Sequence, residues 1–155
     1  MKFKDLFRTW NLDCIKLNLK FAEFEFSTTE DDQTAAWDMY VELITRVTTQ
    51  PLTLSDGDET TALASVYSLF KITRTILKEK GRNAPSFTKI AVIILNQIIR
   101  PFTAKWHKKE IEGAFESSDE CLVFREELAE LQNKLTNYSK MLADIAMVED
   151  LTVFV

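Results

Sequence analysis

The stretch that decides the fold is Pro85-Ser-Phe-Thr-Lys-Ile-Ala-Val-Ile-Ile-Leu-Asn-Gln-Ile-Ile99, which contains the longest apolar run of the chain. Phe87, Ile90 and Ile94 recur at the spacing of one helix face, and apolar residues continue nearly all round. We therefore expect a central, buried helix over residues 87–110. Pro101 lies inside this pattern, and because proline removes a backbone donor and crowds the preceding turn, the helix is predicted to bend there.

Three further segments combine helical periodicity with capping and stop signals. The predicted helices cover residues 30–50, 56–80 and 119–147. Together with residues 87–110 they predict a mainly α domain, a four-helix bundle-like arrangement with one proline-kinked central member.

The N-terminal segment has a different period. Over residues 14–21, apolar and polar side chains alternate, and period two is typical of a β-strand. We predict a short N-terminal strand with one set of side chains facing the helices, namely Ile15, Leu17, Leu19 and Phe21. The alternation of Leu151, Val153 and Val155 offers a candidate partner for this strand.

Length and composition bound the class of protein. The chain has 155 residues, of which 46% are hydrophobic and 28% charged, so a single globular domain over residues 1–155 is expected. Within it we distinguish a strand and turn segment (1–29), the helical bundle (30–147) and a tail (148–155). Only three glycines and three prolines occur, too few for the turns of an all-β fold.

Location and redox state follow from what the sequence lacks. Cys14 and Cys121 form no recognisable motif, so both are predicted to be reduced. No apolar run approaches the ~20 residues needed to span a bilayer, and the first ten residues carry charges throughout. We expect a cytoplasmic protein without a membrane partner.

The charges are distributed unevenly along the chain. Between Lys71 and Lys109 lie ten basic residues and one acidic residue, Glu79, a balance of +9. The net charge of the whole chain is −5, so the remainder carries −14. Such an asymmetry creates a local field and indicates an anionic partner for the basic window.

Catalytic and metal-binding motifs are missing from the sequence. His107 is the only histidine, and its neighbours do not reproduce the ligand spacing of zinc or di-iron sites. No phosphate-binding glycine loop, nucleophile elbow or deaminase motif is present. We therefore predict no cofactor, no metal and no catalytic residue. The hypothesis of an enzyme of unfamiliar type is supported only by the presence of Arg, His and carboxylates.

The segment 100–109 and its surroundings supply the candidate ligand-binding residues. Guanidinium and ammonium groups bind phosphate, an aromatic ring can stack on a base, and amides can orient a ligand. The predicted site consists of Arg46, Asn96, Gln97, Arg100, Lys105, Trp106 and His107. The alternative is that Trp106 packs in the core and the lysines face solvent.

Three strings of the sequence carry a resemblance to a known family. They are Ala36-Trp-Asp-Met-Tyr-Val-Glu-Leu-Ile-Thr-Arg-Val-Thr-Thr-Gln-Pro-Leu52, Arg100-Pro-Phe-Thr-Ala-Lys-Trp-His107 and Met141-Leu-Ala-Asp-Ile-Ala-Met-Val-Glu-Asp-Leu151. They resemble a family of small uncharacterised bacterial helical proteins over most of the chain. The resemblance implies a bacterial, cytoplasmic, self-contained protein and prompts the hypothesis of a role in antiphage defence or stress signalling. It assigns no functional residue.

Two functions follow as expectations. The first is a non-catalytic binding or sensor module that uses residues 71–109 to recognise an anionic, phosphate-bearing ligand, such as a nucleotide second messenger or a nucleic-acid segment. The second is a protein interaction or homo-oligomeric assembly in which the basic face meets an acidic partner face. Duplex DNA is disfavoured as a ligand because the strongly negative remainder would repel a long polyanion.

Overall fold

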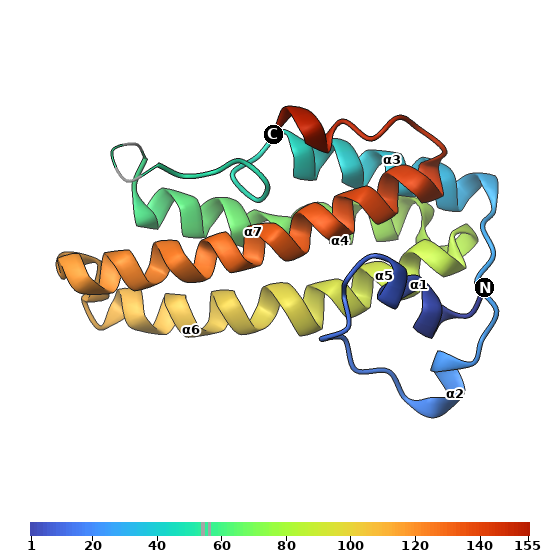
Figure 1. Cartoon of the computed structure of the whole chain (residues 1–155), viewed down its shortest axis with the longest axis horizontal. Helices are drawn as coiled ribbons and strands as arrows, with labels where there is room; N and C mark the ends of the chain where they lie inside the picture. The colour runs from blue at the N-terminus through green and yellow to red at the C-terminus, as the bar shows by residue number, and fades with distance from the viewer. Residues whose placement is uncertain (54, 56) are drawn as a thin grey trace.

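The computed structural model describes residues 1–53, 55 and 57–155 and is mainly helical, with no β-strand among these residues (Figure 1). The α-helices are α1 (Phe3–Thr9), α2 (Leu19–Ala22), α3 (Glu30–Ile44), α4 (Glu59–Lys80), α5 (Pro85–Ile94), α6 (Arg100–Ile111) and α7 (Ser118–Ala146). Shorter turns are the 3-10 helices η1 (Gly81–Asn83), η3 (Ala114–Glu116) and η4 (Thr152–Phe154), and the π-helical turn η2 (Leu95–Ile99).

The long helical segments α3, α4, α5–η2–α6 and α7 run alongside one another and enclose the hydrophobic core (Figure 1). A buried carboxylate joins two of them. Asp32 closes a capping box with Thr29 at the start of α3, and its other oxygen accepts the Phe87 N–H of α5 at 2.8 Å. Because this side chain is fully buried and hydrogen-bonded on both oxygens, it fixes the start of α3 against α5.

Helix α3 is shorter than the predicted span of residues 30–50. It ends at Ile44, where side chains take over the role of backbone donors. The hydroxyls of Thr48 and Thr49 donate to the Leu43 carbonyl at 3.0 and 2.8 Å, and the Gln50 amide donates to the Ile44 carbonyl at 3.1 Å. The polar run after Ile44 therefore caps α3 because its side chains satisfy the carbonyls that a continuing helix would use.

Helix α4 begins later than the sequence predicted. Its first residue is Glu59, and the Asp58 carboxylate accepts the Thr61 N–H at 2.8 Å as the N-cap. The predicted start at Asp56 lies outside the described residues. Helix α7 follows its predicted span within a residue at each end, because Ser117 caps its first turn.

The third helical segment is interrupted before Pro101. The α-helix widens into the π-helical turn η2 over residues 95–99 and resumes as α6, with Pro101 in the first turn of α6. Since proline lacks an N–H and its ring crowds the preceding carbonyl, a wider turn relieves the conflict. Eight of the 15 residues from 85 to 99 are buried, against six of 15 in α3. Val92 is 41% exposed, however, so one edge of α5 reaches solvent.

The predicted N-terminal strand is wrong. Helix α2 occupies the second half of residues 14–21, with the Asn18 side chain accepting the Phe21 N–H at 2.8 Å, and Leu19 is 88% exposed. Upstream, the Gln97 side chain accepts the Lys16 N–H and donates to the Lys16 carbonyl, both at 2.8 Å. The side-chain amide of Gln97 therefore makes the hydrogen bonds that a β-strand at this position would make with a neighbouring strand.

The C-terminal segment does not supply a strand either. Residues 152–154 form the turn η4, and the Leu151 N–H donates to the Tyr40 hydroxyl at 2.6 Å. The only bridge within the described residues is an isolated one between Lys2 and Glu25. Among the same residues, no helix has the length and apolarity to cross a bilayer.

Candidate functional site

Trp106 of α6 is a core residue. Its ring is fully buried, lies nearly parallel to Phe115 (centroids 5.9 Å apart, planes 16° apart) and meets Phe124 edge-on at 5.1 Å. The indole N–H donates to the Glu127 carboxylate of α7 at 2.8 Å. With both faces and its donor engaged, Trp106 anchors α6 to α7 and has no exposed face on which a ligand could stack.

The lysines beside Trp106 are paired with acids of α7. Lys105 forms an ion pair with Glu127, and Lys109 forms one with Glu120 at 2.9 Å. Burial raises the pKa of Glu127, but the hydrogen bonds from Lys105 and Trp106 outweigh it and leave that pKa below its ordinary value. Lys105 is thus held by a protein carboxylate.

A hollow of about 440 Å³ lies between α6 and α7 on this side. Gln97 and Lys105 line it, as the predicted site requires, but so do Glu126, Glu127 and Glu130. Three carboxylates make this hollow unsuitable for a phosphate. Gln97, moreover, already uses its amide to hold the Lys16 backbone.

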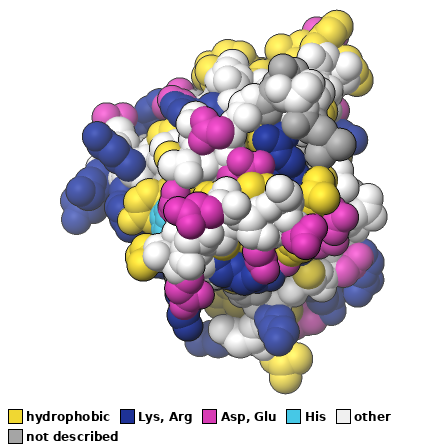
Figure 2. Space-filling view, turned by 90° about the vertical axis from the view of Figure 1, so that its left-hand side faces the viewer, with side chains coloured by type: hydrophobic (Ala, Val, Ile, Leu, Met, Phe, Trp, Pro, Cys, Tyr) yellow, Lys and Arg dark blue, Asp and Glu magenta, His cyan; other side chains and the backbone are white. Residues whose placement is uncertain are grey.

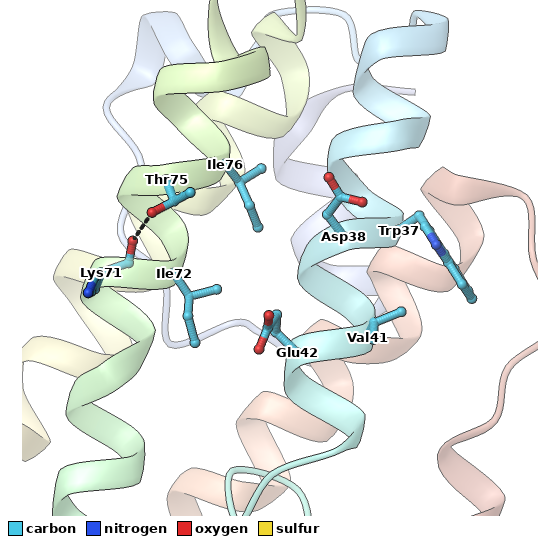
Figure 3. A pocket seen from close by; sticks show the side chains of 8 residues that line it. All are labelled: Trp37, Asp38, Val41, Glu42, Lys71, Ile72, Thr75 and Ile76. Carbon is cyan, nitrogen blue, oxygen red and sulfur yellow. Dashed lines mark hydrogen bonds between the residues drawn. The ribbon is translucent and has the colours of Figure 1, made fainter.

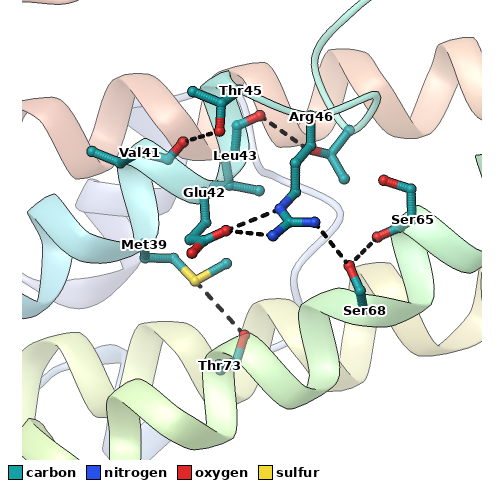
Figure 4. Close-up of polar contacts among 10 residues, drawn as sticks. Met39, Val41, Glu42, Leu43, Thr45, Arg46, Ser65, Ser68 and Thr73 are labelled. Atoms are coloured by element: carbon teal, nitrogen blue, oxygen red, sulfur yellow. Dashed lines mark hydrogen bonds and ion pairs between the residues drawn. The ribbon is translucent and has the colours of Figure 1, made fainter.

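Arg46 lies at the other side of the helical layers, where α3 ends (Figure 4). Its guanidinium donates twice to the Glu42 carboxylate, at 2.7 and 3.0 Å, and once to the Ser68 hydroxyl at 3.5 Å. Both bonds to Glu42 reach the same carboxylate oxygen, and this ion pair gives Arg46 its counter-charge. Arg46 thus joins the end of α3 to α4, and none of its hydrogen bonds among the described residues reaches α6.

A groove of about 430 Å³ lies between α3 and α4 (Figure 3). Ile72 and Ile76 point from α4 towards Asp38 and Glu42 of α3 (Figure 3). Both carboxylates are already paired, Asp38 with Lys80 and Glu42 with Arg46. The groove therefore has an apolar floor and two carboxylates that are already paired, while Lys71 in its lining forms no ion pair among the described residues.

Part of the positive charge that has no acidic partner among the described residues lies on α4 and α6, where guanidinium groups from both helices lie against the ring of Phe70. We define the cationic face as Lys71, Arg74 and Lys78 of α4 with Arg100 of α6, and in the part of the chain that the structure describes none of these forms an ion pair. Figure 2 views the end of the molecule where α6 leads into α7, and Lys and Arg side chains gather at the left of that view.

Two guanidinium groups converge on one ring of this face. The Arg100 Cζ lies 4.8 Å from the centroid of Phe70 and the Arg74 Cζ lies 5.7 Å from it. The Asn96 carbonyl accepts the Arg100 Nε–H at 3.1 Å and orients that side chain. Two like charges that lie against one ring, with no ion pair among the described residues, raise the local positive potential and favour an anion nearby.

Tyr67 and His107 continue the surface beyond Phe70. Tyr67 of α4 is 50% exposed and contacts His107 of α6 edge-on, with ring centroids 4.8 Å apart. The site predicted from the sequence includes neither Arg74 nor Tyr67. The signal that could have found them is spacing: Tyr67, Lys71, Arg74 and Lys78 stand at i, i+4, i+7 and i+11, which is one helix face.

The structure therefore divides the predicted site among separate surfaces. Arg100 and His107 of α6 contact side chains of α4, and Asn96 of η2 holds Arg100, whereas Gln97 and Lys105 line the hollow towards α7. No cluster of His, Cys, Asp or Glu able to hold a metal ion occurs among the residues described. Comparisons with protein-family models, curated proteins and solved structures found no match for the chain.

Proposed function

We propose that this protein is a non-catalytic module that binds an anionic, phosphate-bearing ligand on the cationic face. The observation that carries the proposal is the pair Arg74 and Arg100, which both lie against the ring of Phe70 and form no ion pair among the residues described. Keeping two such charges together is unfavourable in the absence of a counter-charge. A phosphate placed between them supplies that charge.

The chemistry of the two side chains suits phosphate. A guanidinium presents a planar fork of donors that can bind two phosphate oxygens at once, and its stacking on an aromatic ring fixes the plane. Asn96 orients Arg100, and Lys71 adds a further charge one helical turn from Arg74. The proposed site thus keeps Asn96, Arg100 and His107 from the sequence prediction and adds Lys71 and Arg74.

The proposed site needs a rigid scaffold. We interpret the long helical segments as the four-helix bundle that the sequence predicts, and this bundle is the proposed scaffold. The contacts of Trp106 with Phe115 and Phe124 and with Glu127 support this role, because they fix α6 against α7 while α4 carries the other half of the site. The cytoplasmic location and the antiphage role stay predictions.

A second candidate is assembly through charge complementarity. Glu126 and Glu130 of α7 are exposed, line the hollow beside α6 and form no ion pair among the described residues. An acidic surface of this kind on a second copy of the chain, or on another protein, could cover the cationic face.

Calorimetry with inorganic polyphosphate tests the first candidate. We expect binding by the native protein and at least tenfold weaker binding by Arg74→Ala and by Arg100→Ala, since charge-assisted hydrogen bonds contribute about 1.5–3 kcal/mol each. The matched control is Lys134→Ala, which removes an exposed charge of α7 on the far side of α6. Raising the salt concentration should weaken binding.

Equal losses in the control and the arginine variants, or no binding by the native protein, would contradict the proposal. Gel filtration at low and high salt distinguishes the second candidate. An oligomer that dissociates in salt and is lost in Arg74→Ala would assign the cationic face to assembly.

A further inference from the structure

We propose that the ligand of the cationic face is a single-stranded nucleic acid, and that Tyr67 is the surface on which one of its bases stacks. This inference rests on the proposed function and specifies its ligand. It combines three observations: an exposed aromatic ring held in place by its neighbours, a line of cations beginning at that ring, and a convergent pair of arginines next to it.

The Tyr67 ring lies at the surface, where a base could stack on it, and does not fill the core. Half of its surface is exposed, although it stands on a helix whose neighbouring Phe70 is buried. Phe70 lies 5.3 Å from the Tyr67 ring at 45°, and His107 lies 4.8 Å away at 72°. Two ring contacts from two helices therefore orient Tyr67 while part of it stays open, which is the arrangement that stacks on bases of any sequence.

The cations extend from Tyr67 in a line. Lys71, Arg74 and Lys78 follow it on the same face of α4 over 11 residues, which is about 16 Å at the rise of an α-helix. Arg100 of α6 flanks the middle of the line through its contact with Phe70. A row of this length can pair with several phosphates in succession, so it favours a chain of nucleotides over a single one.

The shape of the surface also favours an extended strand. A mononucleotide is usually held in a concave pocket that covers most of it. The hollow between α3 and α4 reaches this surface only at Lys71, and neither that hollow nor the one between α6 and α7 includes Arg74, Arg100 or Tyr67. An acidic peptide could pair with the arginines but would leave Tyr67 without a role, and it is therefore an outcome of the test.

The test is fluorescence anisotropy with labelled oligonucleotides of about 20 thymidines or 20 uridines, a length that exceeds one typical site. We expect the native protein to bind, Tyr67→Ala to bind at least about fivefold more weakly, and Tyr67→Phe to stay within about twofold of native. Arg74→Ala combined with Arg100→Ala should reduce the salt dependence, because log K falls by about 0.7 per log unit of salt for each phosphate paired. Lys134→Ala is again the control, and thermal unfolding checks that each variant is folded.

Inorganic polyphosphate and polyglutamate separate this inference from the proposed function. Tyr67→Ala should leave polyphosphate binding unchanged, because that polymer has no bases. If Tyr67→Ala binds oligonucleotide as tightly as the native protein, base stacking is overturned while phosphate binding stands. If polyglutamate binds as tightly as the oligonucleotide, the ligand is an acidic protein. If neither oligonucleotide nor polyphosphate binds, both proposals fail.

Discussion

The two sides of helix α6 carry similar residue types, basic and aromatic, but have different roles. Towards α7, Lys105 and Lys109 are paired with carboxylates, and Trp106 is buried with its N–H bonded to Glu127. Towards α4, Arg100 lies on the ring of Phe70 beside Arg74, and neither arginine meets an acid in the described part of the chain. One side holds the fold together, and the other leaves positive charge uncompensated.

The difference shows why a charge count along the sequence does not locate a binding site. The window from Lys71 to Lys109 carries +9, but α7 and α3 neutralise Lys105, Lys109 and Lys80 within it. Seven of its ten cations remain without an ion pair among the described residues, and four of these seven form the cationic face. Substitution of these unpaired charges should change the affinity for a ligand, whereas substitution of the paired ones should change the free energy of unfolding.

The largest expected effect on stability comes from the side towards α7. Trp106→Ala removes a fully buried ring between Phe115 and Phe124, and we expect the free energy of unfolding to fall by about 3–5 kcal/mol. Guanidinium denaturation measures it. A loss below about 1 kcal/mol would mean that α6 does not depend on this anchor.

A smaller loss is expected for Glu127→Gln. The change deprives Lys105 of its counter-charge and replaces a charged acceptor of the Trp106 N–H with a neutral one, which should cost about 1–2 kcal/mol. Glu130→Gln is the matched control, since Glu130 is an exposed acid of α7 without an ion pair among the described residues, and should stay within about 0.5 kcal/mol. Equal effects in the two variants would contradict the role of Glu127.

The same carboxylate predicts a pH dependence. Because the pKa of Glu127 is below its unfolded value of about 4.5, its contribution to stability is fully present above that pH. It should be lost as the pH falls through the lowered pKa of the folded state. Urea denaturation of native protein and Glu127→Gln between about pH 3 and 7 should show two curves that converge at low pH; a constant gap would argue against the lowered pKa.

The smallest effect on stability belongs to the side towards α4. Arg74→Ala combined with Arg100→Ala should change the free energy of unfolding by no more than about 0.5 kcal/mol, because exposed charges without partners contribute little. The same variant should lose affinity for polyphosphate. A destabilisation above about 1 kcal/mol would show that the two side chains serve mainly to cover Phe70.

Local signals predicted the helices better than they predicted the N-terminal segment. The capping signals before residues 30 and 119 and the apolar stripe from Phe87 onwards are properties of a few neighbouring residues, and α3, α5 and α7 begin close to where these signals place them. The alternation in residues 14–21 is just as regular, but a strand depends on a partner, and here the partner is the side chain of Gln97. No pattern along the chain reveals that contact.

The sequence by itself determined that the protein is mainly helical, where α3, α5 and α7 begin to within two residues, and that its positive charge is concentrated between Lys71 and Lys109. These properties depend on hydrogen bonds and periodicity within a few turns of chain. Only the tertiary structure decided that Trp106 is buried, that Lys105 is neutralised and that Arg74 and Arg100 lie against the same ring. Each of those outcomes depends on which side chain of another helix lies opposite, and helix packing sets that choice.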